Sequence, residues 1–217
     1  MTKKQTTKSL GKIRRDVSRR SSGGSTRERI VDAALAHFFS HGFRSVTMDD
    51  LAAELGISKK TLYAHFTGKT ELLEAVLADK FARVSSTLER ITRENPHDFS
   101  AALHQLLVGM QHELDEIKPP FVRDMRLKAP QVFKTIERRR AQMIERHFGK
   151  LFADGQRTGM LRRDVPAKLI IEILLGAVQA IMNPPKIEEL GLVPKTAFTG
   201  IIKIVLEGAL TPKGRRA

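Results

Sequence analysis

The sequence predicts an all-α fold, and three observations support this prediction. From Thr26 to Leu210, apolar residues recur with the 3.6-residue period of amphipathic helices. No stretch alternates between polar and apolar residues as a half-buried strand does. Strong turn signals separate the helical segments, namely Gly42, Gly56, Asn95-Pro96, Pro119-Pro120, Gly155 with Gly159, and Pro184-Pro185.

Composition and charge narrow the class of protein. The 217 residues suffice for one or two small domains, and 38 Lys+Arg against 24 Asp+Glu give a net charge of +14. This excess predicts a polyanionic partner, nucleic acid before an anionic membrane. The chain has no cysteine, which excludes disulfides, thiolate metal sites and cysteine nucleophiles. Because no apolar stretch reaches the roughly 20 residues that a bilayer requires, and no secretory signal is present, we expect a cytoplasmic protein without membrane contact.

The excess positive charge is concentrated at the N-terminus. Residues 1–25 contain eight basic side chains and one acidic side chain, and this basic segment ends at Ser21-Ser22-Gly23-Gly24, a flexible hinge by composition. We expect residues 1–24 to form a disordered basic arm, since they lack the apolar face of an organellar transit peptide. The arm could lie in a minor groove, raise non-specific affinity for DNA, or have no role.

Residues 25–70 predict three helices that form one domain. The first carries the apolar stripe Ile30, Ala33, Ala34 and Phe38 and ends at His41-Gly42. The second has Thr47 as its N-cap, acidic residues in its first turn, and an apolar face of Met48, Leu51, Ala52 and Leu55. The third begins after Ser58 as N-cap and runs to about Phe66.

The turn between the second and third helices predicts a helix-turn-helix motif. Gly56 can take the left-handed conformation, and only Ile57 separates it from the next N-cap, so the chain leaves at a steep angle. We expect the apolar side chains Leu55, Ile57 and Leu62 to pack between the helices. The side chains expected on the exposed face are Lys59, Lys60, Thr61, Tyr63 and His65.

The motif and the helix before it contain a specific combination of residues. They are Arg29-Ile30-Val31-Asp32-Ala33-Ala34, Phe38, His41-Gly42-Phe43, Thr47-Met48-Asp49-Asp50-Leu51-Ala52, Gly56-Ile57-Ser58-Lys59-Lys60-Thr61-Leu62-Tyr63-Ala64-His65-Phe66, and Lys69. This combination resembles the DNA-binding domain of TetR-type (TetR/AcrR) transcriptional regulators and covers about a fifth of the chain. The resemblance implies a homodimer, a double-stranded operator with two half-sites, and a C-terminal domain for dimerisation and small-molecule sensing. The long basic arm departs from the usual short N-terminus of the family.

The resemblance also implies which residues contact DNA. The third helix would enter the major groove, with Lys59, Lys60 and Thr61 near the base edges. Phosphate contacts, and contacts shared with helix capping, would come from Thr47, Ser58, Tyr63, His65 and Lys69.

Structural readings of the same residues stay open. Thr47 and Ser58 could act as caps alone, Tyr63 could lie in the core, and Lys59-Lys60 could be a solvated face, since residues 26–68 contain five basic and five acidic side chains. His37 and His41 have the spacing of metal ligands but no third ligand nearby, so we expect no metal site. The sequence shows no catalytic constellation, and we expect neither enzymatic activity nor a cofactor.

Residues 71–212 predict a second, helical domain. A long helix begins near Lys69 and runs past Leu88, and four more fit Asp98–Glu116, Pro130–Asp154, Pro166–Met182 and Pro194–Leu210. The last two are apolar nearly all round, so a second subunit is the expected cover, with burial inside one subunit as the alternative. The expected dimer interface comprises Ile171, Leu174, Val178, Phe198, Ile201 and Val205.

The predicted helix from Pro130 to Asp154 suggests an effector site. Arg140 and His147 fall on its apolar stripe, where a buried cation needs an ion-pair partner such as Glu113 or Asp115, a route to solvent, or an anionic ligand. The predicted pocket comprises Leu106, Met110, Met125, Phe133, Ile136, Arg140, Met143, His147 and Leu174.

The main functional hypothesis is therefore a sequence-specific transcriptional regulator, a repressor that a small-molecule effector releases from its operator. The alternative is an architectural protein that packages nucleic acid through its cationic arm.

Overall fold

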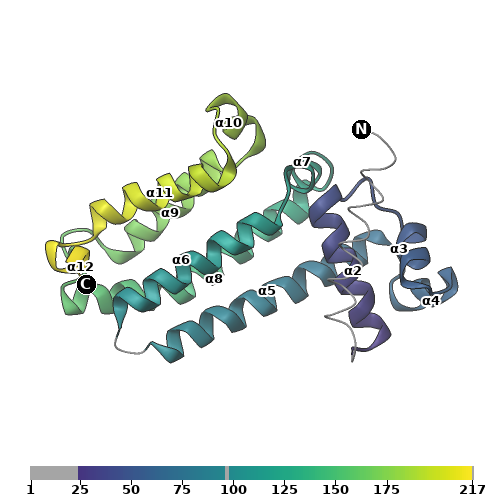
Figure 1. Ribbon diagram of the computed structural model, residues 1–217, viewed down its shortest axis with the longest axis horizontal. Helices are drawn as coiled ribbons and strands as arrows, with labels where there is room; N and C mark the ends of the chain where they lie inside the picture. The colour runs from purple at the N-terminus through teal and green to yellow at the C-terminus, as the bar shows by residue number, and fades with distance from the viewer. Residues whose placement is uncertain (1–23, 96–97, 217) are drawn as a thin grey trace. The chain divides into compact units, whose positions relative to one another are not determined.

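The computed structural model describes residues 24–95 and 98–216, and the described part of the chain is helical without a strand. The predicted basic arm, apart from Gly24, lies outside this part. Figure 1 shows the helices, which are α2 (Thr26–His41), α3 (Met48–Leu55), α4 (Lys59–His65), α5 (Lys69–Glu94), α6 (Phe99–Glu116), α7 (Pro119–Lys128), α8 (Pro130–Thr158), α9 (Ala167–Ile181), α10 (Pro184–Glu189), α11 (Pro194–Ala209) and α12 (Pro212–Arg216). The prediction of an all-α fold is confirmed.

The chain forms two compact units. The first ends at Lys80 and also takes in Lys118–Met125, whereas the second comprises Phe81–Ile117 and the residues from Arg126 onward. The boundary therefore falls within α5 rather than at residue 70, and α7 contributes to both units. None of the helices within the described ranges combines the length and apolar character that a membrane crossing requires.

The three helices of the first unit begin at polar caps. The Ser25 side chain accepts a hydrogen bond from the Glu28 N–H, and the Glu28 carboxylate accepts one from the Ser25 N–H. Thr47 forms the same capping box with Asp50 at the start of α3. At α4 the Ser58 hydroxyl accepts from the Thr61 N–H at 3.0 Å. The predicted capping roles of Thr47 and Ser58 are confirmed, and these caps fix where α3 and α4 begin.

The core of the first unit follows the predicted apolar stripes. Four side chains of α2 are fully buried, namely Ile30, Ala33, Ala34 and Phe38, and Leu51 of α3 and Leu62 of α4 are buried as well. Leu55 and Ile57, which we expected to be buried, are half-buried. His37 in this core lies 2.5 Å from the Glu54 carboxylate, so the histidine has an anionic partner on the neighbouring helix.

Helix α7 belongs in part to the first unit, which the sequence did not predict. Pro119-Pro120 suggested only a break, yet Pro119 is the first residue of α7, a position where proline removes no helical hydrogen bond. The Phe121 and Phe39 rings lie 4.8 Å apart, and the Asp124 carboxylate accepts a 2.8 Å hydrogen bond from the Arg44 N–H. Gly42, at φ +89°, allows this approach, because a Cβ there would lie 2.8 Å from Asp124.

The second unit is a helical bundle. Helix α9 packs against α8 and α11, and α6 contacts both α8 and α11. Its main core gathers large apolar side chains from α5, α6, α8 and α9, with Leu106, Phe148 and Phe152 fully buried. Met110 contacts this core and a smaller cluster between α9 and α11. The second unit thus has its own core.

Two helix ends differ from the prediction. We expected α8 to stop at Asp154, but it continues through Gly155 to Thr158 and ends at Gly159, which has φ +78°. Gly155 serves instead as a contact, because a Cβ there would lie 2.5 Å from the Phe99 ring. Likewise Pro184-Pro185, predicted as a break, begins the short helix α10, whose N-cap is Asn183.

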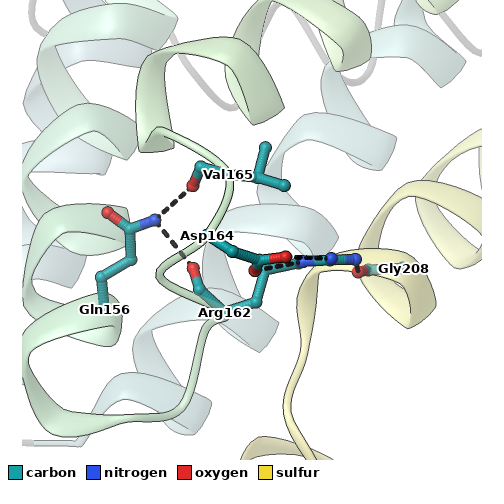
Figure 2. Close-up of polar contacts among 5 residues, drawn as sticks. All are labelled: Gln156, Arg162, Asp164, Val165 and Gly208. Atoms are coloured by element: carbon teal, nitrogen blue, oxygen red, sulfur yellow. Dashed lines mark hydrogen bonds and ion pairs between the residues drawn. The ribbon is translucent and has the colours of Figure 1, made fainter.

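The loop between α8 and α9 is held by side chains at its two ends, which Figure 2 shows. Gln156 donates hydrogen bonds from Nε2 to the carbonyls of Arg162 and Val165, at 2.8 and 2.7 Å. Arg162 forms a two-pronged ion pair with Asp164 and also donates to the Gly208 carbonyl at 3.2 Å. The Arg162 guanidinium lowers the pKa of Asp164, mainly through the hydrogen bond that it donates to the Asp164 carboxylate. The loop is thereby fixed to the end of α11.

Replacing Gly155 with alanine should destabilise the protein by about 1–2 kcal/mol. The new Cβ would displace the buried Phe99 ring, and the energetic cost of this displacement should exceed the gain in helix propensity. Gly149→Ala on the same helix is the matched control, since a Cβ there meets nothing within 4 Å and should stabilise by about 0.5–1 kcal/mol. Urea unfolding measures both free energies, and equal shifts would contradict the contact.

Candidate functional site

The exposed face of α4 is the first candidate site. Lys59, Lys60 and Tyr63 are exposed, with 48% of Tyr63 accessible, whereas Thr61 and His65 are half-buried. The opposite face presents Leu62, which is fully buried. Gly56 at φ +64° and ψ +30° directs the chain into α4, as predicted. The turn thus places polar and cationic side chains outward and the apolar anchor inward.

Lys69 lies at the start of α5 and is half-buried. Its ammonium group lies 4.4 Å from the centroid of the Phe43 ring and donates a 3.4 Å hydrogen bond to the Arg44 carbonyl. Burial lowers the pKa of Lys69, and the carboxylates of Asp124 and Asp50 act in the opposite direction. Its position is therefore set by these contacts, unlike that of a freely mobile surface lysine.

The two capping hydroxyls are already engaged. Thr47 accepts from the Asp50 N–H and donates to the Asp50 carboxylate at 2.6 Å. The Ser58 hydroxyl lies 2.8 Å from the Thr61 hydroxyl and accepts from the Thr61 N–H. A contact of Thr47 with phosphate would have to share or replace its hydrogen bond to Asp50.

Lys59 is paired with Asp49, a contact that the sequence analysis missed. The ammonium group lies 2.7 Å from the Asp49 carboxylate, which projects from the first turn of α3. This hydrogen bond raises the pKa of Lys59. The ten-residue spacing gives no sequence signal, because the contact depends on the angle between α3 and α4.

The predicted effector residues do not form one enclosed cluster around Arg140 or His147. Leu106 and Met143 belong to the main core of the second unit, Leu174 lies in the smaller cluster, and Met125 is buried in the first unit. Arg140 pairs with Glu137 of its own helix at 2.9 Å. The ring of Phe133, half-buried like Ile136, lies under the Arg126 guanidinium at 5.0 Å.

A cleft of about 1530 Å³ lies elsewhere in the second unit, between the end of α5, the start of α6 and the C-terminal half of α8. His147 is the one predicted effector residue among those that line it. The buried His147 ring lies 3.3 Å from the Ser85 hydroxyl, and burial lowers its pKa. Charged side chains surround the cleft, including the pair of Arg146 and Glu89 at 3.2 Å.

The predicted dimer residues lie inside the chain's own bundle. Five of them are buried, namely Ile171, Leu174, Val178, Phe198 and Ile201, and Val205 is half-buried against the same cores. The apolar side chains that α9 and α11 leave exposed are different ones, namely Leu169, Ile173 and Ile204. Burial within one subunit, the alternative reading, thus accounts for most of the apolar character of these helices.

Comparison with known proteins shows which regulators the chain is similar to. A model of the family described as "Bacterial regulatory proteins, tetR family" matches residues 30–76. The chain is 46% identical over 55 residues to the HTH-type transcriptional regulator SrpR of Pseudomonas putida, a match that covers 25% of this chain and 26% of SrpR. It is 26% identical over 188 residues to the regulator UidR of Escherichia coli K12, covering 86% and 93% of the two chains. The solved SmeT–triclosan complex shares the fold, with a TM-score of 0.61 and 21% identity over 87% of this chain and 93% of that one.

His147 predicts a pH dependence of stability. Because its pKa lies below the ordinary value of 6.5 in the folded chain, the unfolded chain binds a proton first as the pH falls through that value, and the free energy of unfolding decreases. His147→Gln should flatten this acidic limb in urea titrations at a series of pH values. His104→Gln, at an exposed position of α6, is the control substitution. An unaltered limb in His147→Gln would contradict the assignment.

Proposed function

Because the chain belongs to the TetR family of bacterial transcriptional regulators, we propose that it is a sequence-specific DNA-binding repressor released from its operator by a small-molecule effector. The observation that carries the proposal is the helix-turn-helix, in which the left-handed Gly56 presents Lys59, Lys60 and Tyr63 on one exposed face. A regulator of this kind acts on DNA in the cytoplasm.

Helix α4 enters the major groove with its N-terminal end toward the base edges. Lys59, Lys60 and Thr61 lie there, and a lysine can donate hydrogen bonds to guanine O6 and N7. Thr47 and Ser58, the N-caps of α3 and α4, supply contacts to phosphate together with Tyr63 and His65, which lie farther along α4. Lys69 adds a charge held by the Phe43 ring and the Arg44 carbonyl, which favours contact with the backbone rather than with bases.

We infer that the protein binds its operator as a homodimer. The exposed side chains Leu169 and Ile173 lie four residues apart on one face of α9, and Ile204 of the adjacent α11 is 75% exposed. A second copy that covers these residues forms a symmetric interface. Such a dimer can present two copies of α4 to half-sites about 34–36 Å apart.

The effector is proposed to bind in the second unit. SmeT, which shares the fold, is described as the repressor of a multidrug efflux pump and has been solved with triclosan. In this chain the cleft beside His147 and the part of α8 around Phe133 and Arg140 are the two candidate sites. An effector that prefers a conformation with another half-site spacing lowers operator affinity by linkage.

Two substitutions test the DNA interface on an operator selected from random duplexes. Tyr63→Phe should weaken binding several-fold with an unchanged salt slope, since it removes one hydrogen bond of about 1 kcal/mol and no charge. Lys69→Ala should weaken binding and reduce the salt slope by about one. Lys150→Ala, an exposed lysine of α8 in the second unit, is the control. Wild-type affinity and slope in both test variants would contradict the interface.

A charge on the exposed face of α9 should prevent dimerisation. Ile173→Glu places a carboxylate on the face that we propose the second copy covers, so sedimentation should report a monomer. Val108→Glu on α6 is the matched control, because Val108 and Ile173 are 51% and 50% exposed. A dimer that survives Ile173→Glu but not Val108→Glu would place the interface elsewhere.

A further inference from the structure

The contact between Lys59 and Asp49 places a negative charge on the surface that we propose faces DNA. The two groups lie 2.7 Å apart, and their side chains are 67% and 56% exposed. Lys59 is the first residue of α4, where α4 approaches the base edges in the proposed complex. A carboxylate in this position repels phosphate, so its presence requires a role other than attraction to the duplex.

Helix capping does not require Asp49. The N-cap of α3 is Thr47, and its reciprocal partner is the Asp50 carboxylate, which accepts hydrogen bonds from the Thr47 N–H and hydroxyl. The hydrogen-bond partner that the structure gives the Asp49 carboxylate is the Lys59 ammonium group. The pair therefore joins the two helices of the motif through side chains that no capping interaction occupies.

Pairing changes what Lys59 can contribute to binding. A lysine ammonium group has three N–H donors, and Asp49 occupies one, which leaves two for other acceptors. The carboxylate cancels much of the charge that Lys59 would offer to any phosphate, because a neutral pair has little long-range attraction to a polyanion. The remaining donors still match the O6 and N7 acceptors of guanine, which act only at short range.

We propose that Asp49 is a specificity-determining residue, which directs Lys59 toward a base edge and screens its charge from the phosphates of non-operator DNA. The inference rests on the proposed function. It predicts that Asp49 lowers the affinity for non-operator DNA more than the affinity for the operator. Asp49 thereby raises the operator preference, which is the ratio of operator affinity to non-operator affinity.

The test measures binding of the full chain to its selected operator and to a scrambled duplex over a series of salt concentrations. Asp49→Asn keeps an oxygen acceptor but removes the charge. It should raise affinity for the scrambled duplex by about two- to fivefold at low salt, the range of an exposed ion pair, and steepen its salt slope by up to about 0.9. Operator affinity should change less, so the operator preference falls. Asp49→Glu should restore the wild-type preference.

Two controls distinguish an effect of the Asp49–Lys59 pair from the general effect of removing a negative charge. In a Lys59→Met background, Asp49→Asn should leave the operator preference unchanged. Glu74→Gln removes a negative charge from an exposed position of α5 within the first unit and should leave the preference unchanged.

An unaltered preference in Asp49→Asn, or an equal change in the Lys59→Met background, would overturn the inference. If the wild-type protein bound both duplexes equally, the proposed function itself would fail, and this outcome is distinct from the previous ones.

Discussion

The left-handed turn at Gly56 is the constraint on which the DNA-binding surface depends. Its N–H donates to the Ala53 carbonyl, and the next N–H, of Ile57, donates to the Ala52 carbonyl at 3.0 Å, so two of the last carbonyls of α3 are satisfied. Ser58 then starts α4 immediately as N-cap. Because the two caps leave a single residue between them, the direction of α4 is set by backbone hydrogen bonds rather than by long-range packing.

Packing then decides which face of α4 stays exposed. Leu62 is fully buried, and Phe66, just after the helix, is also buried and lies beneath the Arg27 guanidinium at 5.0 Å. These anchors direct Lys59, Lys60 and Tyr63 to the opposite side. The His37–Glu54 pair adds a polar link between α2 and α3 in an otherwise apolar core. The motif is therefore supported on its inner side by several independent contacts.

Local signals made the first three helices predictable, whereas contacts between distant segments were not. Thr47, Gly56 and Ser58 act on neighbouring backbone groups, so their roles could be deduced from spacing alone. The link between Asp124 and Arg44 joins residues 80 positions apart, and nothing in the order of residues indicates it. The apolar character of α9 shows that it must be covered, but not which side its own subunit covers. For this reason the sequence predicts Ile171 at a dimer interface, whereas the structure buries this side chain in the chain's own core.

The basic and acidic side chains of residues 26–68 are equal in number, and their local pairing explains how this neutral domain can face DNA. Four of its acidic side chains are engaged locally, since Glu28 and Asp50 complete capping boxes, Glu54 pairs with His37 and Asp49 pairs with Lys59. Glu28 and Asp50 are thereby directed at helix N-termini and Glu54 at His37, whereas Asp49 offsets the charge of Lys59 at the start of α4. Lys60 is exposed, and within the described residues no carboxylate forms an ion pair with its ammonium group. The local arrangement of charges, rather than their sum, makes this face suitable for a polyanion.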